Sequence, residues 1–259
     1  MLAPTELLIL TGAFFIIALL YSSVGFGGGS SYLAILTLAL TSFFLIRSSA
    51  LLCNLVVVSS SCFLYYRKGH LPFKKFLPFI ITSVPLAFLG ATFRLQESVF
   101  FIILGASLII SAIALVVQTV QLKSEYQPKA YPKYIPYFLG GVIGLLSGLV
   151  GIGGGIFLAP LLNHLKWEKP IVIASLASFF ILVNSVSGIF GLLNAATFEL
   201  PLPEILYLVG AVFVGGQIGV RISLGKFSEK TIRLVTAFLV FVVGCRVLFN
   251  NGLQIQFLP

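Results

Sequence analysis

Apolar segments long enough, or nearly long enough, to cross a lipid bilayer follow one another along almost the whole chain. Runs of this kind occupy residues 7–20, 50–65, 76–89, 99–120, 171–193, 205–220 and 232–249. A helix of roughly 20 apolar residues crosses the hydrocarbon core of a bilayer, which is about 30 Å thick. Hydrophobic residues make up 59% of the sequence and charged residues only 9%, whereas roughly 25% of an ordinary soluble domain is charged. The sequence therefore predicts an all-α polytopic membrane protein.

Two stretches of the sequence repeat each other. The segment "SSVGFGGGS" at 22–30 returns as "GLVGIGGGI" at 148–156, so that Gly151 lies 126 positions after Gly25. Later in each half, small residues recur at a spacing of four: Ser83, Ala87 and Ala91, then Ala211, Gly215 and Gly219. Small residues at this spacing let membrane helices approach closely. The sequence therefore predicts two related halves that pack in similar ways.

Each half contains about five hydrophobic segments. We place the first repeat at 1–120, a polar cytoplasmic linker at 121–136 and the second repeat at 137–259. The expected segments are 7–24, 30–46, 48–66, 74–93 and 98–120, then 134–150, 154–165, 170–193, 203–222 and 229–249. An odd number of crossings per repeat inverts the second repeat relative to the first. The segments joined by glycines either span the membrane, giving ten spans, or form two broken or re-entrant hairpins beside eight spans.

Basic residues divide unequally between the two sets of loops that this arrangement creates. One side carries 13 of them: Arg67, Lys68, Lys74, Lys75, Lys123, Lys129, Lys133, Lys166, Lys169, Arg221, Lys226, Lys230 and Arg233. The other side carries 3: Arg47, Arg94 and Arg246. Cytoplasmic loops of membrane proteins are enriched in Lys and Arg. We therefore expect the richer side to face the cytoplasm, both termini to lie outside, and the plasma (inner) membrane to be the location.

The glycine runs interrupt apolar segments at matching places in the two halves. A backbone break at membrane depth is tolerated only inside protein or beside a water-filled cavity. The N–H groups that begin the next half-helix carry about half a positive charge and can bind anions. Interrupted segments in corresponding positions also mark transporter binding sites. We expect an anion site where residues 28–31 and 154–157 converge. The alternative is that glycine only admits a neighbouring helix.

Polar residues near these breaks supply the candidate binding groups. The sequence contains no Asp, and its seven acidic residues are Glu residues in loops or at segment ends. An anion site without nearby carboxylates avoids electrostatic repulsion. The candidate substrate-binding residues are Ser22, Ser23, Gly25, Gly27, Gly28, Gly29, Ser30, Asn54, Gly151, Gly153, Gly154, Gly155, Ser178, Asn184 and Gln217. For Ser and Asn, the alternative is a hydrogen bond across helices or back to the preceding turn.

The motifs "YSSVGFGGGSSYLAILTLAL" and "GLLSGLVGIGGGIFLAPLL" resemble the two repeat motifs of the TauE/SafE family of membrane permeases. The resemblance covers essentially the whole chain. It implies a secondary transporter of small sulfur-containing anions such as sulfite or organosulfonates, often acting as an exporter. One departure is Pro160, which follows the second glycine run and has no counterpart after the first.

Some alternative functions agree with these sequence features and others do not. An anion channel, or a permease for carboxylates or other small anions, would use the same site. A co-transported proton could accompany the substrate, an interfacial group could titrate, or the membrane potential alone could drive transport. Catalysis by Ser147 in "GLLSG" is disfavoured because His70 and His164 lie near the ends of predicted helices. No cysteine spacing typical of a metal site is present, so we predict neither an enzyme nor a metal or cofactor.

Overall fold

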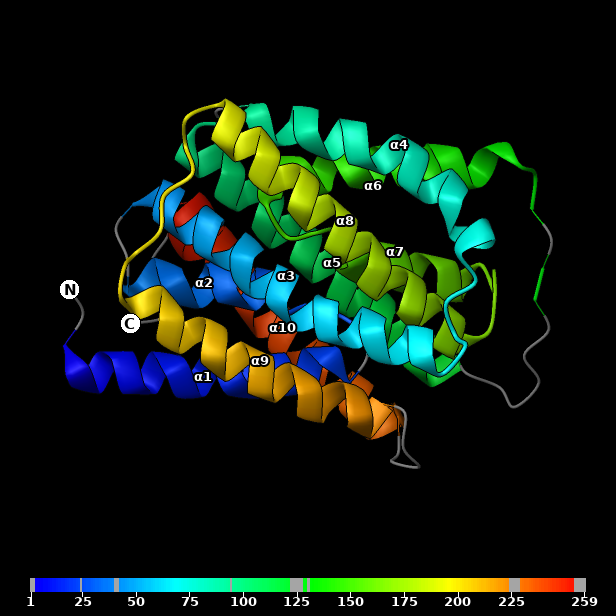
Figure 1. Ribbon diagram of the computed structural model, residues 1–259, viewed down its shortest axis with the longest axis horizontal. Helices are drawn as coiled ribbons and strands as arrows, with labels where there is room; N and C mark the ends of the chain where they lie inside the picture. Colours follow the sequence, from blue (N-terminus) through cyan, green and yellow to red (C-terminus); the bar gives the residue numbers. More distant parts are fainter. Residues whose placement is uncertain are drawn as a thin grey trace.

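The described residues of the computed structural model are 3–23, 25–39, 42–93, 95–121, 128–129, 131–223 and 229–253. They form ten α-helices and a final π-helix, with no strand among them (Figure 1). The elements are α1 (Pro4–Ser22), α2 (Gly29–Ala39), α3 (Phe43–Arg67), α4 (Phe73–Thr92), α5 (Glu97–Gln121), α6 (Tyr134–Val150), α7 (Gly155–His164), α8 (Pro170–Asn194), α9 (Glu204–Ser223), α10 (Glu229–Arg246) and η1 (Val247–Gly252). The predicted all-α class is confirmed.

Six of the helices are long and apolar enough to cross a membrane: α1, α3, α4, α5, α8 and α9. The outside of the bundle is correspondingly apolar, with Leu8, Ile110, Phe138 and Phe238 among the large exposed side chains. Such side chains are stable on the outside of a protein when lipid rather than water surrounds it. The chain is therefore an integral membrane protein.

One predicted boundary is wrong. Hydropathy predicts that the second segment ends at residue 46 and that Arg47 lies in an outer loop. In the structure α2 ends at Ala39 and α3 begins at Phe43, so Arg47 lies inside the first turns of α3. An apolar run that continues from one helix into the next gives hydropathy no boundary, and a charged residue is then mistaken for one. Of the other basic residues assigned to loops, Arg94, Lys123 and Lys226 lie outside the described residues, as do 122–127 and 130 of the linker.

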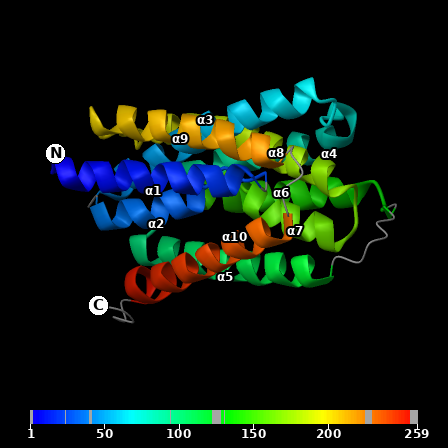
Figure 2. The same cartoon turned by 90° about the horizontal axis from the view of Figure 1, so that it is seen from below.

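The two ends of the bundle differ in charge. α1 begins and η1 ends at one end, which we call the terminal end (Figures 1 and 2). The turns between α3 and α4 and between α7 and α8 lie at the opposite end. We call it the basic end because Arg67, Lys68, Lys166 and Lys169 lie in or beside these turns. Lys75 of α4 forms an ion pair there with Glu168, which lies between α7 and α8. The positive-inside rule predicts that the basic end faces the cytoplasm.

The half-helices after the glycine runs are short. α2 contains 11 residues and α7 contains 10, which makes them about 16 and 15 Å long at 1.5 Å per residue. That is about half of the hydrocarbon core. α1 and α2 run in opposite directions on either side of the glycines (Figure 2). The lengths therefore favour two broken hairpins over ten full spans.

The helix contacts follow the two-fold repeat of the chain, so each contact has an equivalent when the helices of one half are replaced by those of the other. α1 packs on α9 as α6 packs on α4, while α3 packs on α8 and α5 on α10. Small residues permit the closest approaches: a methyl group built on Gly144 or Gly148 would collide with the backbone of Ser83 or Ala87. Close helix packing along the first predicted small-residue ridge is thereby confirmed, and Gly215 of the second ridge is equally tight against Phe15.

Candidate functional site

The two glycine breaks meet inside the bundle. We call residues 25–28 the first break and residues 151–154 the second break. Both border one small cavity of about 10 Å³, lined by Tyr21, Phe26, Gly27, Gly28, Gly29, Ser30, Ile152, Ile156 and Ile181. A space of that size holds about one water molecule. The starts of α2 and α7 thus lie together, which is the geometry expected from the repeated motif.

Glycine is required at several positions of both breaks. Gly25 and Gly28 have φ values of 85° and 87°, and Gly151, Gly153 and Gly154 have values of 77° to 79°. This left-handed region is strained for residues that carry a Cβ. Gly151 ends α6 in this conformation, and its N–H donates to the carbonyl of Ser147 at 2.7 Å. The repeated glycines therefore reverse the chain within the protein interior.

Asn54 of α3 connects the two breaks. The N–H of Gly29, at the start of α2, donates to Asn54 Oδ1 at 2.9 Å. Asn54 Nδ2 in turn donates to the carbonyl of Ile152 in the second break at 3.0 Å. The side chain is fully buried. One carboxamide therefore satisfies backbone groups from both halves, and it occupies the N-terminal end of α2 that an anion would otherwise reach.

The serines that precede the first break bond to the protein. Ser22 Oγ donates to the carbonyl of Ala18 at 2.6 Å and lies 3.2 Å from the carbonyl of Gly216 on α9. Ser23 Oγ donates to the carbonyl of Leu20 at 2.6 Å. Both hydroxyls thus follow the alternative in which serine bonds back to its own helix.

The remaining polar groups at the first break are mostly bonded as well. Ser178 Oγ of α8 donates to the carbonyl of Gly25 at 3.1 Å. The hydroxyls of Tyr21 and Ser31 lie 2.5 Å apart. The Tyr32 hydroxyl is buried without a partner. Apart from that group, the first break is held together by its own hydrogen bonds.

Two hydroxyl groups beside the second break lack partners. Ser147 Oγ and Ser185 Oγ are buried without a hydrogen bond, and both amide atoms of Asn184 on α8 are likewise buried and unbonded. A methyl group built on Gly153 would lie 3.2 Å from Ser185 Oγ, and one on Gly154 would lie 3.0 Å from Ser147 Cβ. No side chain caps the start of α7. Buried polar groups without partners are unusual in proteins and call for an explanation.

Arg47 is the group at this site that the sequence did not identify. Its side chain is only 3% exposed. A methyl group built on Gly151 would meet Arg47 Cγ at 2.8 Å, and Arg47 Nη2 donates to the carbonyl of Gly148 near the end of α6. Arg47 Nε has no partner. The available signal was a single Arg in an apolar run seven residues before Asn54, because an ionisable residue at membrane depth indicates function.

Gln217, another predicted contact, lies on α9 and is half-buried. It is not among the residues that line the central cavity, and its carbonyl accepts a hydrogen bond from Arg221 Nη1 at 2.9 Å. The structure therefore brings Ser30, Asn54, Ser178 and Ser185 to the glycine breaks. Gln217 does not line the cavity between the breaks.

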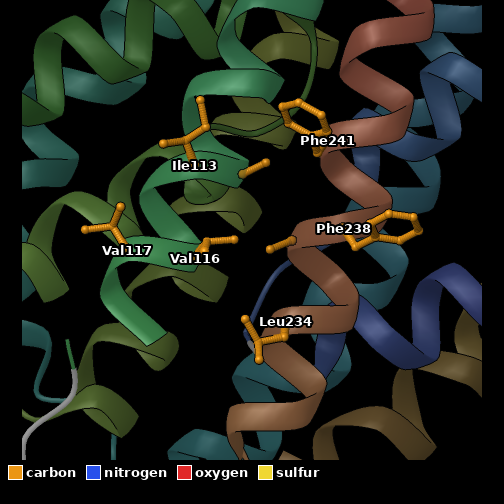
Figure 3. A pocket seen from close by; sticks show the side chains of 8 residues that line it. Ile113, Val116, Val117, Leu234, Phe238 and Phe241 are labelled. Atoms are coloured by element: carbon orange, nitrogen blue, oxygen red, sulfur yellow. The ribbon is translucent and has the colours of Figure 1, made fainter. Parts of the chain in front are cut away.

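Two larger hollows are apolar. A groove of about 330 Å³ lies between α5 and α10 (Figure 3), and its lining is Ala112, Ile113, Val116, Val117, Leu234, Ala237, Phe238 and Phe241. A second groove, of about 1040 Å³, lies between α4 and α8, and Ser187 is the one polar residue in its lining. Ser187 Oγ is already bonded to the carbonyl of Val84 at 2.6 Å. Neither groove offers free donors for an anion.

Known membrane transporters are similar to this chain in sequence. The sequence pattern described as "Sulfite exporter TauE/SafE" matches residues 10–247. A "Probable membrane transporter protein" of Sinorhizobium fredii is 32% identical over 248 residues, which is 95% of this chain and 99% of the relative. A similarly described protein of Methanocaldococcus jannaschii is 31% identical over 120 residues, or 43% of this chain and 44% of the relative. No solved structure matches. The chain belongs to the TauE/SafE family of membrane transporters.

Proposed function

We propose that the protein is a secondary transporter that exports small sulfur-containing anions, such as sulfite or organosulfonates, by alternating access. The observation that carries this proposal is the meeting of two glycine breaks, one from each half, around one cavity deep in the bundle. Discontinuous helices that meet at the interface of two repeats are the usual binding site in secondary transporters. The description of the family, sulfite exporter, supports the choice of cargo.

The chemistry of the second break suits an anion. The start of α7 presents uncapped N–H groups and the positive end of a helix dipole. The hydroxyls of Ser147 and Ser185 have no protein partner. No acidic residue lines the cavity between the breaks, to which the second break contributes Ile152. A negatively charged cargo would therefore meet donors and no carboxylate, and no chemical conversion of the cargo is part of the proposed function.

Transport requires the two breaks to separate. The cavity of about 10 Å³ accommodates about one water molecule, and sulfite is larger than water. Rocking of one repeat against the other opens such sites in secondary transporters. Asn54 bonds both Gly29 and Ile152. In this mechanism the bond between Asn54 and Ile152 breaks when the halves move apart and forms again when they close.

The membrane potential favours export of an anion. With the basic end in the cytoplasm, an inside-negative potential drives negative charge outward by about 2.3 kcal/mol per charge for each 100 mV. A proton carried with the substrate would change this balance, and it stays a candidate co-substrate. Measuring the internal pH of vesicles during anion flux distinguishes the two modes.

Purified protein in proteoliposomes tests the proposal. We expect loss of radiolabelled sulfite or ethanesulfonate from loaded vesicles to saturate with substrate concentration and to show counterflow. Single-channel currents in a planar bilayer would instead establish the anion channel. Counterflow with acetate or other carboxylates, and none with sulfur oxyanions, would establish the alternative small-anion permease. An absence of flux for every anion would reject the proposal.

A further inference from the structure

Arg47 is a buried positive charge without a carboxylate partner. A guanidinium group stays protonated in proteins, and a buried charge that lacks a counter-ion is strongly unfavourable. Among the described residues, the one salt bridge joins Lys75 and Glu168 at the basic end. The backbone N–H of Glu199 lies near Arg47, bonded to Ser48 Oγ at 3.2 Å, but its side chain is exposed and forms no ion pair with Arg47.

The carbonyl of Gly148 neutralises this charge only in part. The last carbonyls of a helix carry about half a negative charge, and Arg47 donates to one of them at the end of α6. Arg47 Nε stays buried and without a partner. Arg47 Nε is therefore a buried donor that lacks an acceptor, and no carboxylate among the described residues pairs with the guanidinium.

Arg47 lies on the face of α3 that borders the second break. Residues seven apart share one face of a helix, so Arg47 and Asn54 point to the same side. Asn54 bonds the carbonyl of Ile152, and Arg47 lies against Gly151. The two side chains therefore flank the second break along α3.

The first break has no equivalent charge among the described residues. Gly25 corresponds to Gly151, and a methyl group built on Gly25 would meet Ala174 Cβ at 2.7 Å. A methyl group thus occupies the place that the Arg47 side chain occupies at the second break. The described part of the central site holds a single cation.

We propose that Arg47 and the second break together bind the charged group of the cargo and limit it to anions that carry one negative charge. This inference rests on the proposed function and specifies its substrate class. One guanidinium and no carboxylate make a neutral site when a monoanion binds. A dianion would leave one uncompensated charge in a medium of low dielectric constant, where charge is strongly disfavoured. Organosulfonates and hydrogen sulfite therefore bind in preference to sulfate and to doubly charged sulfite.

Thermal-shift titrations of the purified protein test this specificity, because a ligand that binds the folded state raises the melting temperature. The ligands are ethanesulfonate as a monoanion, sulfate as a dianion and dimethyl sulfone as a neutral analogue. We expect ethanesulfonate to bind the native protein at least about tenfold more tightly than sulfate, and dimethyl sulfone to cause no shift. Arg47→Gln should weaken ethanesulfonate binding about a hundredfold. Arg47→Lys should weaken it less and keep the preference for the monoanion.

Further measurements distinguish a role of Arg47 in anion binding from a role in protein stability. If Arg47 only caps α6, Arg47→Gln lowers the melting temperature of the unliganded protein but leaves the shift caused by ethanesulfonate intact, which overturns the inference. Arg221 is an exposed arginine of α9, and Arg221→Gln should keep the shift; its loss there would also overturn the inference. Vesicles that contain the native protein should transport ethanesulfonate. If they do and the Arg47→Gln variant shows the same selectivity, the role of Arg47 is rejected and the proposed transport function is retained. No flux of any anion in native vesicles rejects the transporter itself.

Discussion

The two glycine breaks have similar backbones and different surroundings; one backbone difference is that Gly153 is left-handed and its counterpart Gly27 is not. Both use left-handed glycines to reverse the chain, at Gly25 and Gly28 in one and at Gly151 and Gly154 in the other. The first break is held by hydrogen bonds to protein atoms, including the carboxamide of Asn54, and the Tyr32 hydroxyl is the one buried group there without a partner among the described residues. The second is bordered by a buried guanidinium and by hydroxyls that have no protein partner.

The difference shows how a repeated fold can serve two purposes. Asn54 corresponds by the 126-residue offset to Phe180, whose ring lies against Gly154. The start of α2 is therefore bonded by a side chain, and the start of α7 is not. We propose that the first break has a structural role, because protein hydrogen bonds hold it, and that the second break binds the anion. Each of the following experiments compares a residue at one break with a matched residue elsewhere.

Valine at Gly154 should have the largest effect on transport. The residue has a φ of 78°, and a Cβ there would meet Phe180 and Ser147. Backbone strain and overpacking together should lower the free energy of unfolding by about 3 kcal/mol and abolish transport. Gly210→Val is the control, because a Cβ added at Gly210 would have nothing within 4 Å. Native-like flux in Gly154→Val would show that the second break has no role in transport.

Leucine in place of each buried asparagine should separate a bonded amide from an unbonded one. Asn54→Leu leaves the Gly29 N–H and the Ile152 carbonyl without partners, so we expect a loss of about 2 to 4 kcal/mol. Asn184 has no partner for either amide atom, and Asn184→Leu should therefore change stability by less than about 1 kcal/mol. Denaturant unfolding in detergent measures both. Equal losses would contradict the contrast between the bonded amide of Asn54 and the unbonded amide of Asn184.

Two serines of α8 provide a finer comparison. Ser178→Ala removes the hydrogen bond to Gly25 and should cost about 1 kcal/mol of stability without a large change in anion affinity. Ser185 lies against Gly153 without a partner, so Ser185→Ala should leave stability unchanged and weaken anion binding about tenfold. Calorimetric titration with ethanesulfonate gives the affinities. The reverse pattern would place the anion at the first break.

The smallest effect belongs to a pair remote from both breaks. Lys75 lowers the pKa of Glu168 below its usual value by donating a hydrogen bond to the carboxylate. The folded state therefore binds this proton less readily than the unfolded state. The resulting stability is present above the unfolded pKa, about 4.3, and is lost as the pH falls through the folded value.

Because the Lys75 side chain is 57% exposed, the pair should contribute less than about 1 kcal/mol. Glu168→Gln should remove this part of the acid sensitivity, and ethanesulfonate affinity should not change. Melting temperatures between pH 3 and pH 7, compared with those of the native protein, check the expectation. A large change in anion affinity would connect the basic end to the binding site.

Much of this fold could be predicted from sequence because hydropathy and small-residue spacing are local signals. The predicted segment 134–150 coincides with α6, and 170–193 differs from α8 by one residue. The glycine repeat correctly indicated that the two breaks would meet. The position of Arg47 could not be predicted in the same way, because an apolar run hid the boundary between α2 and α3. The two hydrogen bonds that Asn54 forms with Gly29 and Ile152 join groups from distant parts of the chain. No local sequence pattern encodes such a contact.

A crystal structure with 2-bromoethanesulfonate bound would test the central claim most directly. This ligand is a monoanionic sulfonate, and its bromine gives an anomalous signal that locates it without ambiguity. We predict a bromine peak beside the second break, with the sulfonate bonded to Arg47 and to the N–H groups at the start of α7. A peak at the first break, with the second break empty, would contradict the account.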